Sequence, residues 1–102
     1  MFDERLKMYE NIKKNLAENK YVELLVRVLN HDMLPRIPIL SVRYIEYGEE
    51  SNEVIMSLDK YGSNLLRVQS QHEVYVDEDE DDKFYVVTDR ENESTVVIVA
   101  EK

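Results

Sequence analysis

Histidine and cysteine, which often act as general bases and nucleophiles near neutral pH, are scarce or absent in this chain. The chain contains two histidines and no cysteine, so its imidazole groups are those of His31 and His72. His31 stands beside Asp32, but adjacent residues on a helix do not face one another. No serine lies in a Gly-x-Ser-x-Gly turn. We therefore expect both histidines to be surface residues, and we expect no catalytic residue.

Alternating carboxylates in residues 77–82 are the next candidate, because calcium prefers oxygen ligands. Asp77, Asp79 and Asp81 have the spacing that begins a calcium-binding loop. Such a loop needs glycine at its sixth position and glutamate at its twelfth, where this chain has Asp82 and Thr88. The chain has two glycines in all, too few for a glycine-rich phosphate loop. The sequence predicts no specific metal site and no cofactor.

The acidic residues are numerous and unevenly distributed. The chain has 22 acidic and 13 basic residues, for a net charge of −9. Residues 1–45 hold eight basic and six acidic residues, whereas residues 46–102 hold five basic and sixteen acidic ones. So many carboxylates single out no acid–base pair for catalysis. A field of this sign repels nucleic acid and anionic membranes and attracts basic proteins. We expect a non-enzymatic protein that binds no nucleic acid or membrane directly.

A set of acidic residues in and beside the predicted turns forms the candidate partner-binding site. Alternate turns of a meander lie at one end of the sheet, so we expect several of these carboxylates to form one negative face. Carboxylates on a rigid sheet can imitate a row of phosphates and enter the nucleic-acid channel of an enzyme. The alternative role is a solvated loop that preserves solubility. The set comprises Glu46, Glu49, Glu50, Glu53, Asp77, Glu78, Asp79, Glu80, Asp81, Asp82, Glu91 and Glu93.

Tyrosines near these turns are candidate apolar anchors for the same partner. Aromatic residues carry much of the binding free energy at protein interfaces. The candidates are Tyr44, Tyr47, Tyr61 and Tyr75. For each one taken singly, ordinary packing in a strand is the favoured interpretation.

The first element that must support these residues is a helix over residues 3–18. Apolar residues recur there at steps of four, three, three and four, the period of one helical face. Asp3 suits the N-cap, and Asn19 with Lys20 forms a reasonable stop. The predicted buried face consists of Phe2, Leu6, Tyr9, Ile12 and Leu16.

Residues 21–34 are ambiguous between helix and strand. Val22, Leu24, Val26 and Val28 alternate as in a strand. The polar residues of the segment instead fall on one helical stripe, and the Glu23–Arg27 spacing supports a helix. We favour a second helix slightly, ended by the prolines at 35 and 38.

The remainder has the pattern of an antiparallel meander, with short apolar strands between polar turns. The acidic segment 77–82 is expected to be a loop. Residues 65–69 and 73–76 are either two short strands or one strand with a break. The valine-rich segment near the C-terminus is apolar on both faces, so it must be central or covered. The expected strands are Ile39–Tyr47, Glu53–Leu58, Leu65–Gln69, Glu73–Val76, Lys83–Thr88 and Thr95–Ala100.

Together these elements predict an α+β fold in a single domain, residues 1–102. One or two N-terminal helices, within residues 1–34, would pack on a five- or six-stranded antiparallel meander sheet over residues 39–101. The N-terminal residues lack the apolar segment of a signal peptide, and no apolar run is long enough to span a membrane. Together with the absence of cysteine, this leads us to expect a cytoplasmic protein.

Residues Ile39–Val68 resemble part of the phage uracil-DNA-glycosylase inhibitor family. The similarity lies in a hairpin with an acidic turn, the strand NEVIMSLD and another apolar strand. The Gln-Glu-Ser-Ile segment of that family does not occur here, so no functional residue is carried over. More broadly, the chain resembles small, acidic, cysteine-free DNA mimics and anti-CRISPR proteins of phages and mobile elements.

The resemblance and the charge lead to one main hypothesis and two alternatives. The main hypothesis is a phage or mobile-element inhibitor, of anti-CRISPR or similar type, that binds the basic surface of a nucleic-acid-binding host enzyme. In the phage case it would act in the host cytoplasm. One alternative is an assembly module that forms a homodimer through an edge strand such as Thr95–Ala100. The other is an immunity protein against a basic nuclease toxin.

Overall fold

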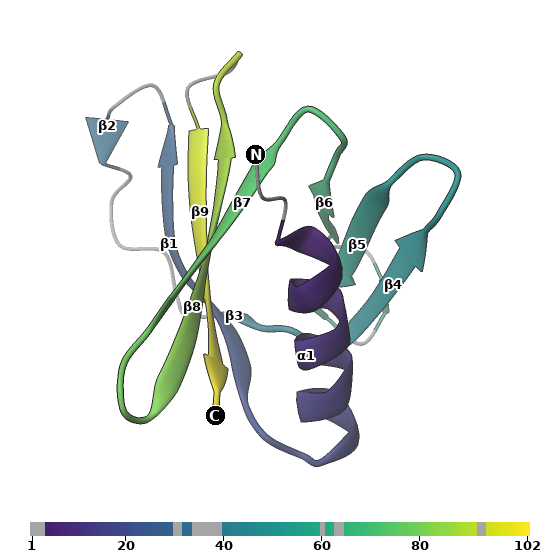
Figure 1. Cartoon of the computed structure of the whole chain (residues 1–102), viewed down its shortest axis with the longest axis vertical. Coiled ribbons are helices and arrows are strands. Elements are labelled where there is room, and N and C mark those ends of the chain that lie inside the picture. The colour runs from purple at the N-terminus through teal and green to yellow at the C-terminus, as the bar shows by residue number, and fades with distance from the viewer. Residues whose placement is uncertain (1–3, 30–31, 34–39, 60, 63–64, 92–93) are drawn as a thin grey trace.

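The computed structural model describes residues 4–29, 32–33, 40–59, 61–62, 65–91 and 94–102. In this part of the chain, helix α1 (Arg5–Ala17) lies between two antiparallel sheets (Figure 1). The α+β class and an N-terminal helix are therefore confirmed. No helix among the described residues is long and apolar enough to cross a membrane.

The larger sheet contains four long strands in the order β1, β9, β8, β7. Strands β7, β8 and β9 form part of the predicted meander, and β9 lies inside the sheet as its two apolar faces require. Two short strands, β2 and β3, also pair with β1. The bounds are β1 (Val22–Leu29), β2 (Asp32–Met33), β3 (Leu40–Ser41), β7 (Glu73–Glu78), β8 (Asp82–Asp89) and β9 (Ser94–Glu101).

The smaller sheet is a meander of β4 (Tyr44–Gly48), β5 (Glu53–Ser57) and β6 (Leu65–Val68). The prediction of one continuous sheet is therefore wrong. The chain leaves the larger sheet at Val42, whose N–H binds the carbonyl of Val22, and joins the smaller one at Arg43, whose N–H binds that of Ser57. The expected strand 39–47 is thus divided, and its residue 39 lies outside the described residues.

The favoured second helix is also wrong, because Val22–Leu29 is a strand. It pairs with β9 along its length, with one register shift between Leu24 and Val26. Val22 and Leu24 face the core, at 2 % and 5 % exposure, with half-buried Glu23 between them. Strand pairing with valine-rich β9 outweighs the Glu23–Arg27 helical spacing, which contributes only about 0.5 kcal/mol or less.

The buried stripe of α1 matches the predicted one only in part. Met8 and Ile12 are fully buried, whereas Leu6 is 47 % exposed. Arg5 and Asn15 extend this stripe at either end, and each donates hydrogen bonds to backbone carbonyls. The stripe was misjudged because hydrophobicity gives no weight to polar residues buried with their hydrogen bonds satisfied. The proposed N-cap Asp3 lies outside the described residues.

The helix ends where the sequence predicted, in a left-handed turn. Asn19 has a φ of 60°. Its N–H binds the Leu16 carbonyl, and the N–H of Lys20 binds the Asn15 carbonyl. This is the Schellman pattern, with asparagine in the position that glycine usually takes.

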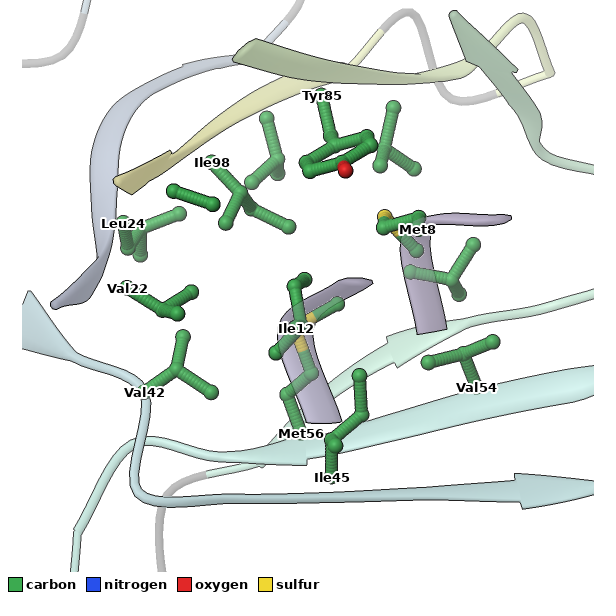
Figure 2. Packing of buried hydrophobic residues seen from close by; sticks show 14 of the residues in the cluster. Met8, Ile12, Val22, Leu24, Val42, Ile45, Val54, Met56, Tyr85 and Ile98 are labelled. Atoms are coloured by element: carbon green, nitrogen blue, oxygen red, sulfur yellow. The ribbon is translucent and has the colours of Figure 1, made fainter. Parts of the chain in front are cut away.

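One hydrophobic cluster joins the helix to both sheets. Figure 2 shows Met8 and Ile12 of α1 between Tyr85 and Ile98 of the larger sheet and Val54, Met56 and Ile45 of the smaller one. Neither sheet can bury its inner face without the other elements.

Candidate functional site

The acidic segment forms the tip of the β7–β8 hairpin, which we call the acidic tip (Asp77–Asp82). Strands β7 and β8 pair in register up to Glu78 and Lys83. Beyond them the N–H of Asp79 binds the carbonyl of Asp82 at 3.0 Å. The predicted acidic loop is therefore a tight turn with strand residues at both ends.

The carboxylate of Asp79 organises this turn. Its Oδ1 accepts hydrogen bonds from the N–H groups of Asp82 and Asp81, both at 2.8 Å. These two bonds hold the pKa of the Asp79 carboxyl below its ordinary value, with a smaller contribution from the charge of Lys102. One acid of the run thus has a structural role as a side-chain cap on a turn.

The chain terminus and Tyr21 tie the acidic tip to the rest of the sheet. The N–H of Lys102 binds the Asp81 carbonyl at 2.9 Å. Its ammonium group binds the Asp79 carbonyl and lies 3.7 Å from the Glu78 carboxylate. The Tyr21 hydroxyl donates to Asp82, and this hydrogen bond is the main cause that raises the pKa of Tyr21 to about 12.

The remaining charge of the acidic tip faces solvent. Asp77, Glu78, Glu80 and Asp81 are exposed. Within the described part of the chain, Asp77, Glu80 and Asp81 form no ion pair. The tip therefore presents a dense negative charge on a backbone that internal hydrogen bonds hold in place.

The other predicted partner-binding acids lie elsewhere. Glu49 and Glu50 are exposed at the β4–β5 turn, and the β7–β8 turn lies at the opposite side of the molecule (Figure 1). Glu46 is exposed on β4, and Glu53 is half-buried and pairs with Arg67 at 3.1 Å.

Glu91 and Glu93 do not extend the acidic tip either. Glu91 is exposed after β8, at the end of the larger sheet opposite the tip. Glu93 lies outside the described residues. The expectation of one face that joins the three turns is therefore wrong, because the hairpins belong to two sheets and point in different directions.

The four tyrosines divide between core and surface. Tyr47 is half-buried, its ring lies 5.6 Å from that of Tyr9, and its hydroxyl donates to Asn52. Tyr44 and Tyr61 are 59 % and 79 % exposed beside a groove on the outer face of the smaller sheet. Tyr75 is 48 % exposed on β7, two residues before the acidic tip.

His72 is not the surface residue that the sequence suggested. Its side chain is 12 % exposed, Nδ1 accepts the N–H of Gln69 at 2.8 Å, and Nε2 lies 3.0 Å from Asp89 Oδ2. Because Nδ1 is an acceptor, the neutral ring carries its proton on Nε2 and donates it to Asp89. Both ring nitrogens are occupied, so this pair supports the fold and offers no free general base. His31 lies outside the described residues.

A groove of about 640 Å³ lies beside the acidic tip, between α1 and the β7–β8 hairpin. Buried Tyr85 is part of its lining, and Asn11 donates to the Tyr85 hydroxyl at 2.6 Å. Burial is the main cause that raises the pKa of Tyr85. Charged residues of both signs make up most of the rest of the lining: Glu4, Lys7, Glu10, Lys14, Asp77, Glu78 and Lys83.

No grouping of three or more histidine, aspartate or glutamate side chains suited to a metal ion occurs among the described residues. Comparison with protein families, curated proteins and solved structures finds no match to this chain.

Proposed function

We propose that this protein is a non-enzymatic inhibitor whose acidic tip occupies the nucleic-acid-binding groove of a basic enzyme. The observation that carries the proposal is a solvent-facing run of carboxylates on an ordered hairpin. Asp79 and Lys102 fix the backbone of the turn, while Asp77, Glu80 and Asp81 remain open to a partner.

Order in the turn matters for binding, because a flexible acidic loop would lose conformational entropy when it docks. Long-range attraction between the acidic tip and a basic groove would speed association and make it sensitive to salt. We propose more specifically that the target is a nuclease of host defence and that this protein is an anti-CRISPR protein of a phage or mobile element.

The test is capture of partners from a nuclease-treated host lysate, followed by elution with single-stranded DNA. The variant D77N/E80Q/D81N removes three charges at the acidic tip and keeps the Asp79 cap. The matched control, E49Q/E50Q/E91Q, removes three charges from exposed positions away from the tip.

We expect a nucleic-acid-binding enzyme to bind the wild type and the control at about 0.1 M salt, where the Debye length is about 10 Å. The tip variant should lose this partner, and DNA should displace the wild type from it. The captured enzyme should also be inhibited in an assay of its own activity. Equal retention by both variants, or a partner that binds DNA and this protein together, would contradict the proposal.

The two alternatives fare differently. We no longer favour a homodimer through Thr95–Ala100, because β9 pairs with β1 and β8 on its two sides and is not an edge strand. An immunity protein would use the same electrostatics, and a toxin nuclease recovered in the capture experiment would identify it.

A further inference from the structure

Strand β7 forms one edge of the larger sheet, and at one residue of this edge, Val76, the backbone is open to pairing with another strand. Strand β7 pairs with β8 on one side and is the last strand of the sheet. Backbone groups on such an edge point outward and can bind another strand. Which groups point outward follows from the pairing pattern.

The hydrogen bond between Asp79 and Asp82 sets this pattern. In an antiparallel pair, residues that bond their partner alternate with residues that point away from it. Counting back from Asp79 in steps of two, the backbone N–H and C=O groups of Asp77 and Tyr75 point towards β8. Those of Val74, Val76 and Glu78 point outward, away from the sheet. The Val74 carbonyl accepts the N–H of Glu4, which confirms the outward direction independently.

Two of the three outward positions are already occupied in part. Glu4 binds the Val74 carbonyl at 3.4 Å, and Asp77 Oδ1 accepts the N–H of Glu78 at 2.9 Å. In the described part of the chain, nothing outside β7 binds the N–H or carbonyl of Val76. Backbone groups of Val74 and Glu78 are therefore already hydrogen-bonded, whereas Val76 between them can pair with an added strand.

The groove described above lies beside this opening. Val76 is 37 % exposed and lines the groove together with Lys7, Asn11 and Tyr85. An extended segment paired with Val76 would direct its central side chain into the groove and its two neighbours to the other face. On that face stand Tyr75 and Asp77, the first residue of the acidic tip.

From this geometry we infer that β7 binds an extended, basic segment of the partner protein by strand addition opposite Val76. The inference rests on the proposed function and names its mode of recognition. An apolar residue of the segment enters the groove, and a lysine or arginine next to it meets Asp77 on the other face. Main-chain hydrogen bonds give the affinity and the alternating side chains give the selectivity. A second copy of this chain is a poorer occupant, since each copy carries a net charge of −9.

The test uses Val76→Pro, which removes the outward N–H without removing a β7–β8 hydrogen bond. Val76→Thr is the matched control, because it changes the side chain and keeps the N–H. The probe is a synthetic peptide of alternating lysine and valine, about seven residues long, enough to span β7 at about 3.3 Å per residue. Binding is followed by amide chemical shifts and by hydrogen exchange.

We expect the peptide to shift the Val76 amide of the wild type and to slow its exchange. Val76→Pro should weaken binding by about fivefold or more, and Val76→Thr by less than about twofold. A peptide N-methylated at its central valine should bind wild-type protein as weakly as the unmodified peptide binds Val76→Pro. This experiment tests strand addition even if Val76→Pro does not fold. Unchanged binding of that peptide, or peptide-induced dimerisation in sedimentation, overturns the inference.

The two proposals fail in different ways. If strand addition is wrong but the acidic tip binds a basic partner, Val76→Pro retains the captured enzyme and D77N/E80Q/D81N loses it. If the proposed function is wrong, neutralising the acidic tip leaves capture unchanged.

Discussion

Arg5 and His72 are joined by a hydrogen bond of 2.6 Å from Nη2 of the guanidinium to the His72 carbonyl. The same guanidinium binds the carbonyls of Asn52, Gln69 and Ser70 at 2.7 to 3.3 Å. Arg5 therefore connects the start of α1, the β4–β5 turn and the segment that crosses from the smaller sheet to the larger one. Arginine suits this position because its planar fork carries five N–H donors.

Replacing Arg5 should destabilise the whole fold. Arg5→Met keeps the apolar stem but leaves four backbone carbonyls without their charged donor, so we expect the free energy of unfolding to fall by about 3 kcal/mol. Arg5→Lys should recover part of this loss. Urea denaturation measures the change, and Lys7→Met is the control, since exposed Lys7 should matter by less than about 0.5 kcal/mol. An Arg5→Met protein as stable as the control would contradict this role.

The two contacts of the His72 ring, with the Gln69 N–H and with Asp89, can be tested separately by mutation. His72→Phe loses both, and we expect a loss of about 2 kcal/mol in unfolding free energy. His72→Asn places an oxygen near the position of Nδ1, so it should keep the bond from Gln69 and lose only the contact with Asp89. Hydrogen exchange at the Gln69 amide is the readout: slow in wild type and His72→Asn, fast in His72→Phe. Equal protection in all three would refute the assignment.

The contact between Tyr21 and Asp82 should make the acidic tip sensitive to alkaline pH. The Tyr21 pKa is raised from 10.0 to about 12, so the folded protein holds this proton more tightly than the unfolded chain. The stabilisation is complete below pH 10 and is lost as the pH rises through about 12. Carbon-13 labelling of the tyrosine ring follows the titration. Asp82→Asn should move the Tyr21 pKa back towards 10.0, and an unmoved value would contradict the hydrogen bond.

Two asparagines with positive φ should respond differently to replacement by glycine. Asn19 (φ 60°) ends α1, and glycine there should raise the free energy of unfolding by about 0.5 kcal/mol. Asn52 (φ 52°) also accepts the Tyr47 hydroxyl, so Asn52→Gly should bring no gain. Thermal unfolding of the two variants makes the comparison, and a larger gain at Asn52 would be the opposite of what the structure predicts.

Local patterns in the sequence were sufficient for several elements. The helical period located α1 near its true bounds, and alternation with polar turns located the hairpins of β4–β5 and β8–β9. The apolar faces of the C-terminal strand required a central position, which β9 has. The sequence also showed that the negative charge lies in residues 46–102. These features depend on periodicity and composition, which a chain carries before it folds.

Tertiary structure alone decided how the pieces combine. Val22–Leu29 becomes a strand because β9 pairs with it, and the meander divides between β6 and β7, where Arg5 binds the carbonyls of the connecting segment. The acids at the β4–β5 turn and those of the acidic tip lie on different sheets, so charge alone did not reveal which of them act together. The opening at Val76 depends on hydrogen-bond direction along an edge strand, a property of the assembled sheet. Each of these outcomes requires contacts between residues far apart in the chain, and local sequence patterns do not encode them.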